Sequence, residues 1–422
     1  MRWLVGGEVL DVDEGTFRRV DVGIDTSTGR IAELGTARPT ADDGVVDLTG
    51  RWLLPGLIDC HAHLTLTTTA GDPMAEASRS DAHVALDTAA AAERTLLAGV
   101  TTVRDVGGWN YVEMAVRDAV RRGIARGPRM FLAGRLLSIT TSTVDYYPGM
   151  YEVADGADAV RAAARRQLAK GADLIKVMAT GAMLSSETED SRAIQFTLDE
   201  LRAAVEIAHD NFKHVAAHCH ALRGIHQAVE AGVDSIEHGT FADDDALRAM
   251  AAAGTVLVPT VCASELLFRD EHAVATMPDH LLERMRAFND LHVDTLRRAG
   301  ELGVTLAMGT DAGTPGNHHG LNAWECVFLH RLVGLSPIES IRTATVHAAR
   351  LLRQPDLGRV EGGAHADVIA VASYLAGIVP LGGIALIDLG VIAKGRDEHA
   401  KMGLHAALVG VPHKTLGEEP AA

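Results

Sequence analysis

The stretch VEAGVDSIEHG, residues 229–239, ends a helical pattern at Gly232 and passes directly into a short apolar segment. A glycine after the last helical turn supplies a left-handed cap, and the apolar run that follows is typical of a strand buried on both faces. The same pattern occurs in LLAGVTTVRDV (96–106), LAKGADLIKVM (168–178), MAAAGTVLVPTV (250–261) and GELGVTLAMGTD (300–311). These copies of helix, glycine and strand predict an α/β protein with parallel strands.

Three further apolar runs bring the candidate strands to eight: LLPGLIDCHAH (53–63), PRMFLAGRLLS (128–138) and KHVAAHCH (213–220). Helical patterns such as TLDELRAAVEIAHDN (197–211) separate most of them. Eight strand–helix units favour a (β/α)8 TIM-like barrel, although a count of strands leaves an open doubly wound sheet as an alternative.

The two ends of the chain differ from this pattern. Residues 1–55 contain short alternating strands between Gly and Asp turns, and GRVEGGAHADVIAVAS (358–373) resembles one more pair of strands. We therefore expect a small β-sandwich domain built from residues 1–55 and 355–422 around a barrel of residues 56–354. Residues 374–422 are Gly-rich and weakly periodic, and their pattern predicts no element.

The composition restricts the class of protein. Hydrophobic residues make up 47% of the 422 residues and charged residues 23%, which indicates a folded globular chain rather than a disordered one. The formal net charge of -17 and the lack of a basic run argue against nucleic acid and anionic membranes as partners. The N-terminal segment does not read as a signal peptide, and no apolar stretch is long enough to span a bilayer convincingly.

The cysteines indicate a reducing compartment. They are widely spaced and form no CxxC pair, so they suggest neither a disulfide framework nor a zinc knuckle. They are Cys60, Cys219, Cys262 and Cys326. We expect a cytoplasmic protein.

His61 and His63 follow the apolar run LLPGLIDC. Strand alternation puts both imidazoles on one side, and the carboxyl end of a barrel strand faces the barrel mouth. Two neutral imidazoles suit a borderline-soft ion such as zinc. By itself, an HxH sequence is equally consistent with a structural role.

Lys176 lies in the apolar strand pattern DLIKVM. Lysine is rarely buried without a partner, so its presence there requires an explanation. One interpretation is a side chain that reaches solvent from the strand end. The alternatives are a Schiff-base lysine or a modified metal ligand.

His218 closes the strand pattern VAAH, His238 closes SIEH, and Asp311 follows LAMGT. Each alone is consistent with a hydrogen-bonded core histidine or a solvated loop aspartate. All three occupy the same kind of position, the end of a predicted strand. At the mouth of a metal site, Asp311 could bind an ion and transfer a proton.

In this combination, the chain resembles the binuclear form of the amidohydrolase superfamily. The strings LLPGLIDCHAHL, GVTTVRD, GADLIKVMATGA, VDSIEHGT and GTDAGTP are similar to the imidazolonepropionase-like, Xaa-Pro dipeptidase-related branch. The similarity covers approximately residues 45–370. It implies a metal-dependent hydrolase, of the peptidase or amidase type, that cleaves an amide-type C–N bond of a small molecule. A homo-oligomer is also expected.

The resemblance implies a role for each ligand of two divalent metal ions, most simply zinc. His61, His63 and Asp311 would hold the more buried ion, and His218 and His238 the more exposed one. Lys176 would be carboxylated to N6-carboxylysine and bridge the two. A bridging hydroxide would attack the substrate carbonyl, and Asp311 would move its proton to the leaving nitrogen.

The substrate pocket departs from the dipeptidase pattern in LSITTSTVDYYPGMY (137–151), where Thr143 stands at the position of a family histidine and Tyr147 follows. Aromatic side chains at this place could stack on a flat group. The predicted substrate contacts are Thr143, Tyr147, His220, His319 and Asn322. The substrate classes left open are a dipeptide or N-acyl amino acid, and a flat aryl amide, urea or carbamate.

Two other functions compete with this one. A mononuclear cyclic-amidine deaminase usually carries Glu three residues after the fifth-strand histidine, where this chain has Ala221. A non-catalytic barrel scaffold would be expected to lose its ligands, yet all six positions are intact.

Overall fold

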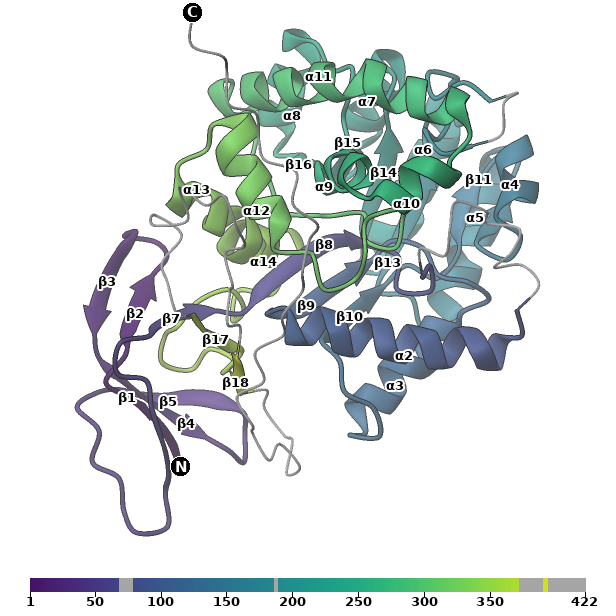
Figure 1. The fold of residues 1–422 in the computed structure, drawn as a ribbon. Helices are drawn as coiled ribbons and strands as arrows, with labels where there is room; N and C mark the ends of the chain where they lie inside the picture. The colour runs from purple at the N-terminus through teal and green to yellow at the C-terminus, as the bar shows by residue number, and fades with distance from the viewer. Residues whose placement is uncertain (68–78, 186–188, 372–389, 394–422) are drawn as a thin grey trace, which may run out of the picture.

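The computed structural model describes residues 1–67, 79–185, 189–371 and 390–393. Figure 1 shows a larger part in which helices surround strands, and a smaller part made of strands beside it. Within the larger part, one sheet has the order β10-β9-β8 and a second has the order β12-β11-β13-β14-β15-β16. Every neighbouring pair in these two sheets is parallel, so the predicted α/β class is confirmed.

The parallel strands are short, and most of them are buried, whereas β12 is intermediate to exposed. The first sheet contains β8 (Leu57–Ala62), β9 (Val100–Asp105) and β10 (Arg129–Leu132); the second contains β11 (Leu136–Ser138), β12 (Tyr151–Val153), β13 (Leu174–Met178), β14 (His214–Cys219), β15 (Ser235–His238) and β16 (Val256–Val258). Strands β8, β9, β13, β14, β15 and β16 are buried at every position, as expected for strands covered on both faces.

The prediction of one continuous third strand over residues 128–138 is wrong. The segment forms β10 and β11, which Gly134 separates at φ 74°. A positive φ interrupts an extended strand, and glycine adopts it without the steric cost that a Cβ brings. Because of this break, β11 pairs with β12 and β13 instead of continuing beside β9.

Residues 304–311, the last predicted strand, lie between the two parallel sheets. The amide of Ala307 donates to the carbonyl of Leu257 in β16, and the amide of Cys60 in β8 donates to the carbonyl of Met308. An isolated parallel bridge joins Leu306 to Leu257. The segment therefore connects the edges of both sheets, although it forms no continuous ladder.

Close packing explains the irregular course of this segment. A Cβ on Gly309 would lie 2.3 Å from Val258 Cγ1 and 2.7 Å from the Cβ of His61. Only glycine fits there without displacing a neighbour. Two residues later, Asp311 adopts φ 60°, which turns the chain away from strand geometry.

Helices flank the parallel strands. The longer ones are α2 (Asp81–Leu97), α3 (Val112–Arg121), α5 (Ala157–Ala169), α6 (Leu198–Asp210), α7 (Leu222–Ala231), α8 (Asp244–Ala253) and α11 (Asp279–Glu301). Gly232 and Gly254 cap α7 and α8 in the left-handed conformation that the sequence pattern predicts. The largest apolar core packs strand residues such as Ile175, Val215 and Ile236 among helix residues.

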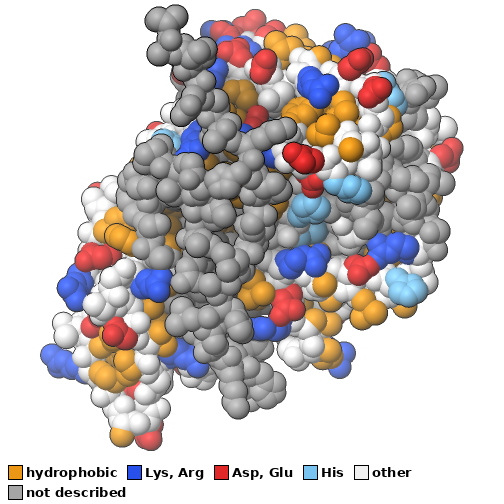
Figure 2. All heavy atoms as spheres, in the orientation of Figure 1, with side chains coloured by type: hydrophobic (Ala, Val, Ile, Leu, Met, Phe, Trp, Pro, Cys, Tyr) orange, Lys and Arg blue, Asp and Glu red, His pale blue; other side chains and the backbone are white. Residues whose placement is uncertain are grey.

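The remaining helical segments are short. They are α4 (Ser142–Tyr146), α9 (Cys262–Glu265), η1 (Leu267–Arg269), α10 (Glu271–Thr276), α12 (Trp324–Phe328), the π-helices η2 (Leu329–Val333) and η3 (Thr343–His347), α13 (Pro337–Arg342) and α14 (Ala348–Leu351). Across the described residues, we find no helix with the length and apolar character needed to cross a membrane. On the face that Figure 2 shows, basic and acidic side chains are interspersed among the coloured atoms.

The smaller part combines strands from both ends of the chain. One sheet has the order β5-β4-β1-β6, with β1 (Arg2–Val5), β4 (Asp21–Asp25), β5 (Arg30–Gly35) and β6 (Gly44–Asp47). The other has the order β18-β17-β7-β2-β3, with β2 (Glu8–Asp11), β3 (Thr16–Arg19), β7 (Trp52–Pro55), β17 (Val368–Val371) and β18 (Gly390–Ala393). Strand β17 pairs antiparallel with β7, which brings residues from the C-terminal region into a sheet with the N-terminal strands. Most of residues 374–422 lies outside the described part.

Candidate metal centre

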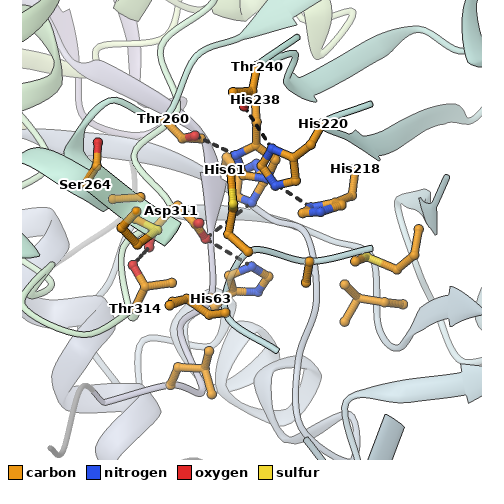
Figure 3. A pocket seen from close by; sticks show the side chains of 18 of the residues that line it. His61, His63, His218, His220, His238, Thr240, Thr260, Ser264, Asp311 and Thr314 are labelled. Carbon is orange, nitrogen blue, oxygen red and sulfur yellow. Dashed lines mark hydrogen bonds and ion pairs between the residues drawn. The ribbon is translucent and has the colours of Figure 1, made fainter. Parts of the chain in front are cut away.

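Six side chains predicted as ligands line one cavity at one end of the parallel strands, and Figure 3 labels all of them except Lys176. His61 lies near the end of β8, with His63 directly after it, and Lys176, His218 and His238 lie in β13, β14 and β15. Asp311 is the last residue of the segment 304–311, whose backbone is hydrogen-bonded to both β16 and β8. Carboxyl ends of parallel strands share one edge, so residues 250 positions apart in sequence line the same cavity. The cavity measures about 940 Å³, part of it open to solvent.

The nitrogen and oxygen atoms of these side chains lie close together. The Asp311 Oδ1 atom is 3.4 Å from His61 Nε2 and 3.3 Å from His63 Nε2. His238 Nε2 is 3.0 Å from His218 Nδ1. Two groups of donor atoms each fit within 4.8 Å, one made by His61, His238 and Asp311 and the other by His218, His220 and His238.

In His63, His218 and His238, the ring nitrogen that points away from the candidate metal centre makes a hydrogen bond to the surrounding protein. His63 Nδ1 lies 2.9 Å from the carbonyl of Gly107, and His218 Nε2 lies 3.1 Å from that of Gly181, so both nitrogens act as donors. The hydroxyl of Thr260 donates to a backbone carbonyl and therefore accepts from His238 Nδ1 at 2.7 Å. These hydrogen bonds fix the tautomers.

The fixed tautomers place two nitrogen lone pairs against each other. His218 Nδ1 and His238 Nε2 both lack a proton once the opposite nitrogens donate, yet they are 3.0 Å apart. Burial holds the pKa of both imidazoles well below the ordinary value, so a shared proton does not relieve the repulsion at neutral pH. A cation between them does, and neutral imidazole nitrogen is a donor that zinc prefers.

Lys176 is 1% exposed, and no hydrogen-bond partner for its Nζ is found among the described residues. This burial contradicts the interpretation in which the side chain reaches solvent. Burial also lowers the pKa of the amine to about 8, which leaves much of it neutral in mildly basic solution. A buried, unpartnered amine among metal-type donors fits a group that is modified before it binds. The donor set as a whole therefore fits a metal centre.

Asp311 is ionised in this setting. Desolvation raises the pKa of its carboxyl group, but His61 and His63 more than offset that effect and hold the pKa well below the usual range. Asp311, His238 and Thr260 all have positive φ values, between 60° and 68°. Strained backbone of this kind in non-glycine residues is concentrated at functional sites.

Sequence reasoning missed the partner of His61. Glu237, in β15, lies with Oε2 2.7 Å from His61 Nδ1, while its Oε1 accepts from Arg104 at 2.8 Å. Both Glu237 and Arg104 are fully buried, and Arg104 also donates to Ser235 Oγ. The sequence contained a signal for both residues, because each is a charged residue within an apolar strand pattern, SIEH or TTVRD. Lys176 is singled out by the same anomaly.

We expect Glu237→Gln to destabilise the protein by about 3–5 kcal/mol, because it leaves the buried Arg104 guanidinium without its counterion. The matched control is Arg248→Met, which removes exposed ion pairs to Asp244 and Asp245 and should change stability by less than about 1 kcal/mol. Thermal and urea unfolding of both variants provide the measurement. Equal stability of the two variants would contradict the assignment of Arg104 and Glu237 as a buried pair.

The five predicted substrate contacts fall into two groups. Tyr147 and His220 line the cavity, with His220 Nδ1 hydrogen-bonded to Thr240 Oγ1 at 2.8 Å. Among the described residues, the cavity wall does not include Thr143, His319 or Asn322.

The three side chains outside the wall have other partners. Thr143, in α4, donates to Glu189, and His319 donates to the carbonyl of Leu66 at 3.0 Å. Asn322 donates to Asp59 at 2.7 Å. Asp59 also accepts from the hydroxyl of Thr310, so Asn322 supports the chain next to Asp311 rather than facing a ligand.

An α/β fold with a histidine-rich centre at the carboxyl ends of parallel strands defines a class of hydrolases. The chain belongs to the amidohydrolase family, whose family model matches residues 52–396. Ochratoxinase of Aspergillus niger is 31% identical over 356 residues, covering 76% of this chain and 70% of that protein. Imidazolonepropionase of Streptomyces griseus subsp. griseus is 26% identical over 364 residues, covering 79% and 81%.

A solved structure of a Xaa-Pro dipeptidase with bound methionine is also similar to this chain. It has a TM-score of 0.79 and 33% identity, and the match covers 88% of this chain and 94% of the other. The branch expected from the sequence strings is thus confirmed. Members of the family are hydrolases that act on small molecules.

Proposed function

We propose that the protein is a binuclear metal-dependent hydrolase that cleaves an amide-type C–N bond. The observation that carries this proposal is the pair of lone-pair nitrogens, His218 Nδ1 and His238 Nε2, held 3.0 Å apart by donors that point away from the centre. The Nζ atom of Lys176, which has no hydrogen-bond partner among the described residues, supports a second ion, because carboxylation would turn the amine into an anionic oxygen ligand for both ions.

The donor atoms divide between two sites. His61, His63 and Asp311 would hold one ion, His218 and His238 the other, with carboxylated Lys176 between them. Zinc suits the imidazole-rich set. Two such ions would supply a water-derived nucleophile at neutral pH and polarise the substrate carbonyl.

The chain's own groups then orient the substrate and move the proton. Asp311 is ionised and faces the cavity, so a carboxylate oxygen can accept the proton of the attacking water. The same oxygen can return that proton to the departing nitrogen, which lets an otherwise poor amine leave. Burial lowers the pKa of His220 to about 3, so its neutral imidazole can orient the substrate carbonyl.

The architecture is proposed in the same terms. Residues 56–354 would form a closed (β/α)8 barrel, a closure supported by the backbone hydrogen bonds of residues 305–308 to both sheets and by the bond from the Asp173 amide to the Leu132 carbonyl. Residues 1–55 and 355–422 would form the small β-sandwich domain, supported by the pairing of β17 with β7. Four buried free cysteines fit a cytoplasmic location. The homo-oligomer remains a prediction. Light scattering would measure the oligomeric state.

Metal content and a panel of substrates test the proposed reaction. We expect close to two ions per chain by elemental analysis, loss of activity on chelation, and recovery when zinc is restored. The panel contains amides, ureas, carbamates and a cyclic amidine. One ion per chain together with ammonia release from the amidine would favour the mononuclear deaminase, whereas a metal-free, inactive chain would favour the scaffold.

A further inference from the structure

The wall of the cavity beyond the candidate metal centre is predominantly apolar. Four methionines, Met150, Met178, Met183 and Met285, line it together with aliphatic side chains, and Tyr147, Tyr151 and Phe288 add aromatic rings. Tyr147 and Tyr151 lie with ring centroids 6.4 Å apart. Methionines adapt their shape and make favourable contacts with aromatic groups, so this wall suits a bulky aromatic substituent.

Among the described wall residues, charged side chains occur only at the candidate metal centre. Apart from the histidines, the ionisable wall residues that carry a charge are Lys176 and Asp311, both assigned to the ions. Several polar side chains of the wall are already engaged with protein partners. Ser264 donates to Asn289 at 2.5 Å, and Thr314 donates to the carbonyl of Asp311 at 2.8 Å.

The nearby arginines lie outside the described wall and donate to protein acceptors, one of which is the backbone of a wall residue. Arg284, one helical turn before Phe288 in α11, donates to the carbonyl of Met183 and to Ser185 Oγ. Arg269 pairs with Glu265 at 2.8 Å.

A dipeptide or N-acyl amino acid brings a carboxylate two bonds from the scissile nitrogen. Burying that charge against an apolar wall is unfavourable unless a fixed cation and hydrogen-bond donors replace its water. The formal net charge of -17 adds long-range repulsion. A neutral ligand has no charge to desolvate and is not repelled by the net negative charge of the protein.

We infer that the substrate is a neutral amide, urea or carbamate with a bulky aromatic substituent, and that compounds carrying a free carboxylate beside the scissile nitrogen are disfavoured. This inference rests on the proposed function. It selects the second of the two substrate classes that the sequence left open. It assigns the selection to the Met-rich part of the wall, where the described lining residues include no Lys or Arg.

A matched pair of compounds tests the inference. N-benzoyl-L-phenylalanine and its primary carboxamide have nearly the same shape and differ in charge, and benzoate release reports cleavage of the same bond in both. With zinc-loaded enzyme, we expect kcat/KM for the carboxamide to exceed that for the free acid by about 30-fold or more, the effect of leaving one charge of a buried pair uncompensated. Equal values, or a preference for the acid, would overturn the inference.

A gain of charge provides an independent test. Met285→Arg places a guanidinium on the wall. We expect it to reduce the ratio of kcat/KM for the carboxamide to kcat/KM for the free acid by at least tenfold, whereas the control Met285→Leu should keep the wild-type ratio. An unchanged ratio in an Arg variant that still cleaves the carboxamide would count against the inference. If zinc-loaded enzyme cleaves nothing in the wider panel, the proposed function fails; if it cleaves the acids preferentially, the substrate inference alone fails.

Discussion

Asp311→Asn should lower kcat by about 10²- to 10⁴-fold, the range over which a positioned general base contributes to catalysis. The amide is nearly isosteric with the carboxylate and keeps one oxygen that can bind a metal, but it cannot accept the proton. Steady-state kinetics combined with elemental analysis provide the measurement. Metal content should stay near the wild-type value.

The backbone makes asparagine the informative replacement at this position. Asp311 adopts φ 60°, a conformation in which Asn and Asp are enriched over other non-glycine residues. Asp311→Ala would add backbone strain to the loss of the carboxylate, so its effect would have two causes. Near-wild-type turnover in Asp311→Asn would rule out the proton-transfer role, and loss of both metal and activity would assign Asp311 to metal binding alone.

The strand ends were predictable because each depends on a local pattern. His61, His218 and His238 follow apolar runs of strand length, and parallel strands necessarily bring their carboxyl ends to one edge. Lys176 could be recognised because a charge within an apolar strand requires a reason. The same reasoning would have singled out Glu237 as a charge within an apolar strand, but it would not have indicated His61 as its partner.

The failures concern contacts between residues far apart in the chain. Asn322 was predicted as a substrate contact, but its amide reaches Asp59, 263 residues away. Thr143 was assigned from a family position, yet it turns toward Glu189, 46 residues on. Local composition cannot predict which distant acceptor a polar side chain meets. The division of the third strand at Gly134 was missed for a related reason, since a glycine inside a strand pattern signals a break only when the chain requires a positive φ.

Lys176→Met should remove metal binding together with activity. Methionine keeps most of the apolar stem but offers no amine for carboxylation, so the bridging oxygen ligands are lost. We expect the metal content to fall well below two per chain and kcat/KM to fall at least about 100-fold, since several kcal/mol of transition-state stabilisation depend on the ions. The control is Lys213→Met, outside the cavity wall, which should retain both. Unchanged metal content in Lys176→Met would contradict the bridging role.

The chemistry of carboxylation gives the same residue a pH signature. Only the neutral amine attacks carbon dioxide, and burial lowers the pKa of Lys176 to about 8. About 3% of the amine is neutral at pH 6.5 and about three quarters at pH 8.5. Metal-free enzyme supplied with zinc and bicarbonate should therefore regain activity faster at pH 8.5 than at pH 6.5, and short alkyl carboxylates should partly restore Lys176→Ala by occupying the vacated space. A reactivation rate that depends on neither pH nor bicarbonate would show that the lysine acts as a free amine. A free amine at this position would be difficult to reconcile with its burial among metal-type donors.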